Sequence, residues 1–332
     1  MNKVKMSDIA KAMNISTVTV SKALADKDGV SEKLRAEIKE KAKELGYVYN
    51  RLPLLMREGI TYNIGILISE RFLGAYSFYW EFYHKLQLLL QKTQYSGLLE
   101  IVTADREKEC AMPEFIDGNK VDGLIVLGQF SLPYLEEIVK KNKPYVFLDF
   151  ALDVGGKNSD CVISNNFYGS YTVTNYLIGK GHREIVFVGS LETTSILDRY
   201  LGYLRSMMEH KLAYYPPVAD RDAEGKYIGI QLPERKATAY VCNNDRVASM
   251  LIRTLTEKGF RVPEDVSVTG FDNSEELVDG IGITTMAVDV EKMCEVAVEL
   301  ILKKITTGAE VERGRNLVEC KLVQKQSVAV RA

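Results

Sequence analysis

The sequence is poor in the features that mark secreted, zinc-binding and membrane proteins. Its five cysteines stand singly with no CxxC pair, which favours buried free thiols over a disulfide framework or a zinc site. No apolar run reaches the roughly 18 residues that a membrane span needs. The first residues, MNKVKMSDIAKAM, also lack the apolar centre of a secretory signal. We therefore expect a cytoplasmic protein with no membrane partner.

Signatures of common enzymes are absent as well. The sequence contains no GxSxG, P-loop, HExxH or strand-associated GxGxxG motif, and its three histidines are not paired with a nucleophile. We therefore expect no enzymatic activity, no catalytic residues, no metal and no cofactor. A cytosolic enzyme on a doubly wound fold stays as an alternative, and the missing motifs oppose it.

What the chain has is size and an uneven charge. Its 332 residues, 46% hydrophobic and 27% charged, are enough for two or three ordinary folded domains. The net charge of −2 divides into +4 for residues 1–60 and −6 for the rest. This division suits a chain that contacts phosphate with one end only, although such a charge is weak evidence by itself.

The stretch SDIAKAMNISTVTVSKAL, from Ser7 to Leu24, predicts two short helices joined by a tight turn. Ser7 and Ser16 can cap the helices, and Asn14 can adopt the left-handed turn conformation. A third helix is needed to hold them and is predicted at 31–45, with Gly46 closing it. In a helix-turn-helix of this kind the second helix enters the major groove of DNA. A helical bundle with no DNA role shares the same bare pattern.

The context narrows that choice. VKMSDIAKAMNISTVTVSKAL, followed by GVSEKLRAEIKEKAKELGYVYNR, resembles the amino-terminal signature of the LacI/GalR family of bacterial repressors, and the resemblance continues through most of the chain. It implies a helix-turn-helix headpiece at 1–49, a hinge at 50–60 and an effector-binding and dimerisation domain at 61–332. The residues expected to contact DNA lie on the second helix and the hinge. They are Ser16, Thr17, Val18, Ser21, Lys22, Asn50 and Met56.

The hinge carries one departure from the family pattern. Met56 occupies the position of the apolar residue that family members insert into the minor groove, and a flexible thioether can still unstack a base step. Pro53 stands where the family usually has alanine, and proline is tolerated only in the first turn of a helix. A plain linker that does not touch DNA is the alternative.

Beyond Tyr62, short apolar strands alternate with amphipathic helices, which predicts parallel sheets covered on both faces. About 270 residues of this pattern exceed one compact sheet, so two lobes are expected. The predicted strands are 64–69, 98–103, 122–128, 144–150, 184–190, 238–243 and 266–272, and the predicted helices are 78–95, 132–141, 166–180, 197–210, 244–258 and 290–306.

The family resemblance implies how these elements divide. It implies a two-lobed, periplasmic-binding-protein-like (type I) body of doubly wound parallel sheets. The near lobe would take about 61–160 and 290–322, and the far lobe about 161–289. Residues 210–234 fit no element; their prolines and charges suggest a loop where family members carry a longer segment with a helix.

Ligands of doubly wound sheets bind beyond the carboxyl ends of the strands. Asp149, Asn244 and Asp272 follow predicted strands there, and Arg199 supplies a guanidinium. Carboxylates, amides and a guanidinium suit hydroxyl-rich ligands such as sugars. Each residue alone could equally be a helix cap or a surface charge. The resemblance implies that these four contact the effector, that Ser195 falls on a position that often does, and that Asp245 is structural.

Aromatic side chains are the other requirement, because sugars and purines stack their flat faces on rings. FLGAYSFYWEFYHKL follows the first predicted strand and holds seven of them, including the only tryptophan, Trp80. By resemblance Phe78 and Tyr79 lie at the mouth of the effector site, and Phe150 is a third candidate.

These observations predict a sequence-specific DNA-binding transcriptional regulator, and we expect it to be a repressor. Its operator affinity would be controlled by a small effector held between the lobes, with a sugar or sugar derivative favoured. A nucleoside- or purine-responsive regulator and a sugar-binding module without a DNA role are the alternatives. The expected partners are double-stranded operator DNA, the effector and a second copy of the chain, since one headpiece covers too little DNA for useful specificity. The chain end, LVQKQSVAVRA, has no heptad tail, so no tail-mediated tetramer is expected.

Overall fold

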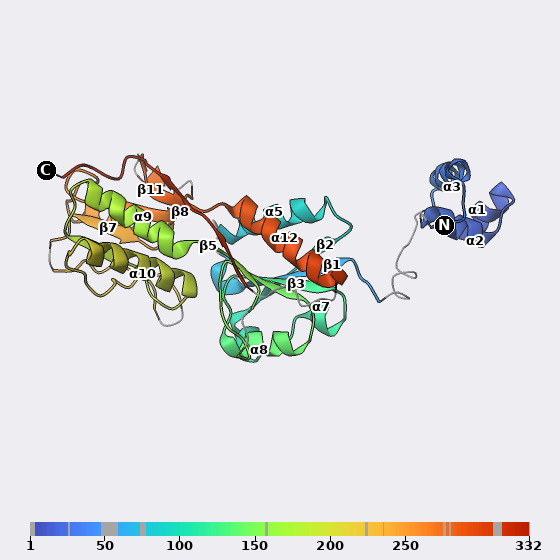
Figure 1. Ribbon diagram of the computed structural model, residues 1–332, viewed down its shortest axis with the longest axis horizontal. Coiled ribbons are helices and arrows are strands. Elements are labelled where there is room, and N and C mark those ends of the chain that lie inside the picture. Colours follow the sequence, from blue (N-terminus) through green and yellow to red (C-terminus); the bar gives the residue numbers. More distant parts are fainter. Residues whose placement is uncertain are drawn as a thin grey trace. The chain divides into compact units, whose positions relative to one another are not determined.

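The computed structural model divides the chain into two compact units, Met1–Thr61 and Tyr62–Ala332, here called the headpiece and the body (Figure 1). Within them it describes residues 4–25, 27–47, 59–73, 78–156, 159–222, 225–234, 236–274, 277–278, 280–307 and 314–331. The predicted hinge contacts Asn50 and Met56, and the unusual Pro53, lie outside these described residues. No helix among the described residues is long and apolar enough to span a membrane.

The headpiece contains the three predicted helices, α1 (Met6–Met13), α2 (Thr17–Leu24) and α3 (Glu32–Glu44). Asn14 ends α1 in the left-handed conformation, with φ of 52°. Ser16 and Ser31 cap the next two helices, each accepting a hydrogen bond from the backbone N–H three residues on. The predicted cap at Ser7 is wrong, because α1 begins at Met6 and its N-cap is Lys5, two residues before Ser7. Asp8 there accepts a hydrogen bond from the backbone N–H of Lys5.

One small apolar core holds the headpiece helices together. Ile9 from α1, Val20 from α2 and Ile38 from α3 are each fully buried in it. Leaving such aliphatic side chains exposed would cost about 1.5 to 3 kcal/mol each, so the short helices are stabilised mainly by one another. This packing turns the other face of α2 to the surface, where Val18 is 63% exposed.

The first lobe of the body is a six-stranded sheet in the order β12-β5-β4-β3-β1-β2, parallel throughout. Helices α5 and α12 cover one apolar face, and α7 and α8 cover the other. Figure 1 shows α5 and α12 side by side on this lobe. The strands are β1 (Asn63–Ser69), β2 (Ser96–Val102), β3 (Gly123–Leu127), β4 (Tyr145–Leu148), β5 (Cys161–Ser164) and β12 (Arg315–Val318), and the helices are η1 (Glu70–Phe72), α5 (Phe78–Leu90), α6 (Ala104–Lys108), α7 (Glu114–Asp117), α8 (Leu132–Lys140) and α12 (Val290–Thr307).

The second lobe is a five-stranded sheet in the order β13-β11-β8-β7-β6, parallel except for β13. Helices α9 and α10 pack on one face and α11 on the other. The strands are β6 (Ile185–Val188), β7 (Ala239–Cys242), β8 (Ser267–Asp272), β11 (Thr284–Ala287) and β13 (Lys321–Val323), with a separate β9 (Leu277–Val278) and β10 (Ile281–Gly282) hairpin; the helices are α9 (Asn166–Gly179), α10 (Thr194–Glu209) and α11 (Asp245–Glu257).

The chain crosses between the lobes at different residues from those predicted. Strand β5, at 161–164, belongs to the near-lobe sheet rather than the far lobe, because it pairs with β4 and β12. Strand β13, at 321–323, pairs with β11 of the far lobe. The far lobe therefore begins after residue 164 and also takes the chain from 321 onward. The predicted boundaries, about 161 and about 322, lie within a few residues of these two crossings.

Residues 210–234 form an irregular segment, as their prolines and charges predict. The described part contains no helix and adds only isolated bridges, between Val188 and Val218 and between Arg221 and Tyr227. The first bridge lays the segment along the free edge of β6. This placement brings the segment to the carboxyl ends of the far-lobe strands.

Candidate functional site

The near lobe contributes a tyrosine and a carboxyl group in direct contact. Tyr79, in the first turn of α5, donates its hydroxyl proton to Asp149 Oδ2 at 2.8 Å. Asp149 follows the last residue of β4 and adopts a φ of 69°, in the left-handed region that residues other than glycine rarely adopt. Its other oxygen, Oδ1, is buried and has no hydrogen-bond partner among the described residues. Strain and an unpaired buried acceptor together are features of functional sites.

The far lobe holds a guanidinium in a fixed position. Arg199, on α10, donates from Nε to Asn166 Oδ1 at 2.7 Å and from Nη1 to the carbonyl of Asn243. Its Nη2 lies 3.2 Å from Asp272 Oδ1, an ion pair that is not an aligned hydrogen bond. The guanidinium also stacks 3.8 Å from the ring centroid of Phe271. All three nitrogens of Arg199 are thus engaged by the protein itself.

The Tyr79–Asp149 pair of the near lobe and the Arg199–Asp272 pair of the far lobe interact electrostatically. Burial raises the pKa of Asp149 to about 6, and the charge of Arg199 opposes that rise. Burial also raises the pKa of Asp272, again against Arg199 and, more weakly, against Arg221. Because one guanidinium acts on carboxyl groups of both lobes, the four residues form one interlobe cluster, defined as Tyr79, Asp149, Arg199 and Asp272. Asp272 has a φ of 98°, so both carboxylates of the cluster lie on strained backbone.

A direct hydrogen bond also joins the lobes, and no sequence pattern indicates it. Gln129, which follows β3, accepts at Oε1 from the backbone N–H of Thr194, the first residue of α10, at 3.0 Å. Arg71 donates to the carbonyl of Gln129 and lies 3.9 Å from the buried carboxylate of Glu107. Gln129 is thereby held at the edge of the near lobe facing the start of α10.

The irregular segment supplies a second arginine. Asp220 is fully buried, and its two oxygens accept from the backbone N–H of Ser190 at 2.6 Å and from the amide of Asn243 at 3.0 Å. These bonds fix the segment over the ends of β6 and β7. The next residue, Arg221, donates to the hydroxyl of Tyr227 at 2.8 Å. The sequence analysis missed Arg221 because the segment around it has no periodic pattern.

Asn244, Ser195 and Asp245 each make local hydrogen bonds. Asn244 caps α11, with Oδ1 accepting from the backbone N–H of Val247 at 2.9 Å, while its amide lies 3.4 Å from the hydroxyl of Tyr227. Ser195 lies in the first turn of α10, 3.3 Å from the hydroxyl of Thr193. Asp245, expected to be structural, is 1% exposed and accepts from the backbone N–H of Ser274, and burial raises its pKa to about 8.

The aromatic candidates divide between the cluster and the core. Tyr79 alone hydrogen-bonds a cluster carboxylate, whereas Phe78 packs edge-on against the buried Phe82, with ring centroids 5.1 Å apart. Phe150, also predicted at the site, is 1% exposed and packs in the near-lobe core. Its ring stacks 4.6 Å from Phe147 in the apolar core, because the left-handed turn at Asp149 breaks the alternation of the strand. Trp80 is 40% exposed on the outside of α5.

The predicted DNA-reading residues occupy the free face of α2. Thr17, Val18 and Lys22 are exposed, and the side chains of Ser16 and Thr19 hydrogen-bond each other at 2.8 Å. Ser21 is partly buried. Arg35 of α3 reaches the carbonyls of Ala23 and Lys27 and so braces the end of α2. The helix therefore presents short polar side chains and one cation on a rigid support, as a groove-reading helix requires.

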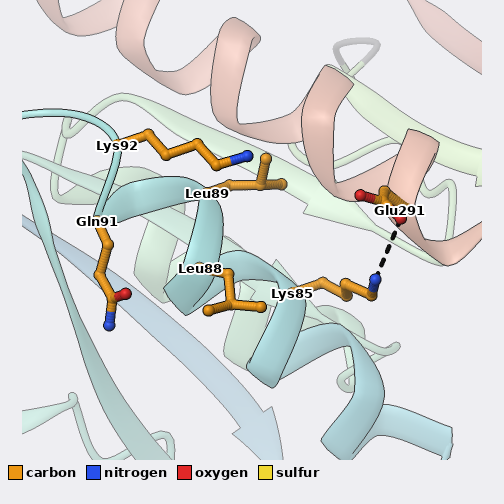
Figure 2. Close-up of a pocket in the computed structure, with 6 residues that line it drawn as sticks. All are labelled: Lys85, Leu88, Leu89, Gln91, Lys92 and Glu291. Atoms are coloured by element: carbon orange, nitrogen blue, oxygen red, sulfur yellow. Dashed lines mark hydrogen bonds and ion pairs between the residues drawn. The ribbon is translucent and has the colours of Figure 1, made fainter.

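One pocket of the body lies apart from the cluster. A shallow pocket between α5 and α12 is lined by Lys85, Leu88, Leu89, Gln91, Lys92 and Glu291, none of which is a cluster residue. Figure 2 shows Lys85 reaching Glu291, the two being 3.1 Å apart. Among the described residues there is no group of three or more His, Cys, Asp or Glu side chains able to hold a metal ion.

A helix-turn-helix joined to two doubly wound lobes, with polar groups gathered where the lobes meet, defines a ligand-binding regulatory protein of the periplasmic-binding-protein-like class. Comparison with known families agrees. Residues 5–50 match the family of bacterial regulatory proteins known as the lacI family, and residues 174–328 match the periplasmic binding protein-like domain. The chain thus carries a lacI-family domain followed by a periplasmic binding protein-like domain, which confirms the predicted fold and the predicted family resemblance.

Relatives resemble the whole chain. The HTH-type transcriptional repressor PurR of Klebsiella pneumoniae is 28% identical, over 98% of this chain and 96% of its own length. The HTH-type transcriptional regulator RegA of Clostridium saccharobutylicum is 28% identical, over 97% of this chain and 98% of its own length. Among solved structures, the lac repressor dimer bound to operator and an anti-inducer superposes with a TM-score of 0.80 at 21% identity, covering 99% of this chain and all of that one. The transcriptional regulator CelR in complex with cellobiose superposes with a TM-score of 0.68 at 23% identity, covering 98% of this chain and all of that one.

Proposed function

We propose that this protein is a transcriptional repressor whose operator affinity is controlled by a small molecule bound between the two lobes of its body. The observation that carries the proposal is the interlobe cluster: a strained carboxylate from each lobe, one tyrosine hydroxyl and one guanidinium, at the carboxyl ends of two doubly wound sheets. Ligands of such sheets bind at this edge.

The DNA-binding half of the proposal rests on α2. Its exposed Lys22 can reach a base edge or a phosphate, and Thr17 and Val18 can contact base edges in the major groove. Ser16 and Ser21 flank this face, and by resemblance Asn50 and Met56 would add contacts from the hinge. PurR, at 28% identity over nearly the whole chain, is named as a repressor, which favours repression over activation.

For the effector we favour a hydroxyl-rich molecule, a sugar or sugar derivative. Asp149 Oδ1 and Asp272 Oδ1 are buried without an aligned hydrogen bond, and each can accept from a ligand hydroxyl group. Ser195 and the amide of Asn244 lie on the far-lobe elements that border the cluster and are the next candidates. Ligand binding would then stabilise one arrangement of the lobes, and the hydrogen bond from Thr194 to Gln129 is one of the contacts between the lobes in that arrangement.

A purine or nucleoside is the second candidate. Several relatives at about 28% identity are named PurR, and a purine would supply ring nitrogens and amino groups to the same carboxylates. Against it, Tyr79 is the one aromatic candidate that hydrogen-bonds a cluster carboxylate, and Phe150 packs in the core.

We also propose that the protein acts as a homodimer. Trp80 and Leu88, both on α5, are 40% and 42% exposed, and Leu88 lines the pocket between α5 and α12. The pocket, shown in Figure 2, offers apolar surface with a partly exposed cation and anion, Lys85 and Glu291. A two-fold interface of this kind would place two headpieces on two half-sites.

The experiment that tests the proposal has two parts. Duplexes selected from a random DNA pool by the purified protein are expected to converge on an inverted repeat, and binding to it should weaken steeply with salt. A thermal-shift screen against sugars, sugar phosphates, sugar acids and nucleosides is then expected to give at least one ligand that raises Tm and changes the affinity for the selected duplex. A pool that never converges would overturn the DNA-binding function. A ligand that binds and leaves DNA affinity unchanged would overturn effector control.

A further inference from the structure

The far lobe brings a second guanidinium, that of Arg221, to the interlobe cluster. Its backbone is fixed there by Asp220, which bonds Ser190 at the end of β6 and Asn243 at the end of β7. The carbonyl of the same Asn243 accepts from Arg199 of the cluster. Arg221 is therefore one residue removed from a network that also holds the cluster arginine, and its charge acts on Asp272.

The side chain of Arg221 is held in place by aromatic contact. Its guanidinium lies 4.6 Å from the ring centroid of Tyr227, and Arg246 lies 4.5 Å from the same ring. The Tyr227 hydroxyl in turn accepts from Arg221 at 2.8 Å. The side chain is 16% exposed, so the group is largely desolvated. A guanidinium fixed in this way has little conformational freedom left to lose when it binds a ligand.

Arg221 has hydrogen-bonding capacity that its neighbours do not use. Its nearest carboxylate is Asp220, but both oxygens of Asp220 already accept N–H groups, and the Arg221 Nε to Asp220 Oδ2 distance is 3.7 Å, too long for a hydrogen bond. Within the described ranges the only hydrogen bond from the Arg221 side chain goes to Tyr227. Arg199 differs, because all three of its nitrogens contact protein groups.

We propose that the effector carries an anionic group, a phosphate or a carboxylate, on a hydroxyl-rich scaffold, and that Arg221 binds this group. The inference rests on the proposed function, namely that an effector binds at the interlobe cluster. The carboxylates of Asp149 and Asp272 then take the hydroxyl groups, and the planar donor fork of Arg221 takes the anion in the bidentate geometry that guanidinium groups favour. A neutral sugar would leave those donors unfilled.

The test compares charged and neutral members of matched pairs. Binding is measured by thermal shift and calorimetry on the full chain for ribose with ribose 5-phosphate, glucose with glucose 6-phosphate and with glucuronate, and adenosine with its monophosphate. Inorganic phosphate alone is the control for non-specific anion binding. In at least one pair the charged member should bind at least about tenfold more tightly than the neutral one, as expected for a charge-assisted bidentate contact. Phosphates and carboxylates form separate arms, so the winning arm names the anion.

The variants identify the residue. Arg221→Ala should remove the preference for the charged member, and Arg221→Lys, which keeps the charge but loses the fork, should retain part of it. Arg246→Ala is the matched control, since it removes the other guanidinium from the Tyr227 ring and leaves Arg221 in place. The control should keep the full preference.

Three results would overturn the inference: equal binding of charged and neutral members, a preference that survives in Arg221→Ala, or no binding of any charged probe. A neutral ligand that binds and alters DNA affinity would leave the proposed function standing while this inference fails. A charged ligand that needs Arg221 but has no effect on DNA affinity would do the reverse.

Discussion

The hydroxyl of Tyr79 and the carboxylate of Asp149 are joined by a hydrogen bond of 2.8 Å between the start of α5 and the end of β4. The two residues lie 70 positions apart in the chain, and the fold alone brings them together. Asp149 is 6% exposed, with one oxygen unpaired among the described residues, so the bond satisfies only half of a buried carboxyl group. An ionised Asp149 is therefore costly until something else contacts it.

This cost makes a prediction about pH. Burial raises the pKa of Asp149 from 3.8 to about 6 in the folded protein. Below about pH 4 both folded and unfolded chains hold the proton, and Asp149 has no effect on stability. As the pH rises from 4 to 6 the unfolded chain loses its proton first, so the free energy of unfolding falls by on the order of 2 to 3 kcal/mol and stays lower above pH 6.

Asp149→Asn should remove that part of the pH dependence, since asparagine can still accept from Tyr79 and never ionises. Urea unfolding at pH 5 and pH 7 measures it. Asp245→Asn is the comparison: the pKa of Asp245 is raised to about 8, so its destabilising effect extends up to pH 8. An Asp149→Asn protein with the same difference in stability between pH 5 and 7 as the parent would contradict the account of Asp149.

A second prediction concerns base reading. Lys22 is exposed on the free face of α2, and Lys22→Ala should cost about 1 to 3 kcal/mol of discrimination at one base pair of each half-site. Fluorescence anisotropy on the selected duplex and on single-base variants measures this. Lys33→Ala, an exposed lysine on α3, is the control and should leave discrimination intact. Equal loss of affinity on every sequence would show that Lys22 contacts phosphate instead.

A third prediction concerns assembly. Leu88 is 42% exposed on the face of α5 shown in Figure 2, and Leu88→Asp would bury a charge in the proposed dimer. The dimer should dissociate at least about tenfold more readily, because each apolar side chain of this size contributes about 1.5 to 3 kcal/mol when buried. Sedimentation velocity measures the change. Leu197→Asp, at a similarly exposed position on α10, should have no effect; if it alone produces monomers, the interface lies on the far lobe.

Much of the fold follows from periodic patterns in the sequence. The three headpiece helices and the parallel strands β1, β2, β3, β4, β6, β7 and β8 carry repeating apolar positions and are bounded by caps or turns, and all were predicted to within a few residues. Strands β5, β11, β12 and β13 were not predicted. Their place in a sheet depends on which distant strand they pair with, so a local pattern carries no signal for them.

The candidate site was predictable where a polar residue ends a predicted strand or helix, as with Asp149, Arg199 and Asp272. The rest depended on backbone conformation and on long-range contacts. Phe150 follows a residue with φ of 69°, and that turn sends its ring into the core instead of toward the cluster. Arg221 lies in an irregular segment whose position is set by the burial of Asp220, a contact made with residues 23 and 30 positions away.

The central claim is that a ligand at the interlobe cluster controls DNA binding, and one measurement tests it most directly. The affinity for the selected duplex is titrated with and without the ligand found by thermal shift, in the parent protein and in Asp272→Asn. The account predicts that the ligand changes the affinity of the parent by tenfold or more and leaves Asp272→Asn unaffected, while both bind the duplex equally without ligand. Asp265→Asn, which alters an exposed ion pair with Arg261, should respond like the parent. An undiminished ligand response in Asp272→Asn would contradict the claim.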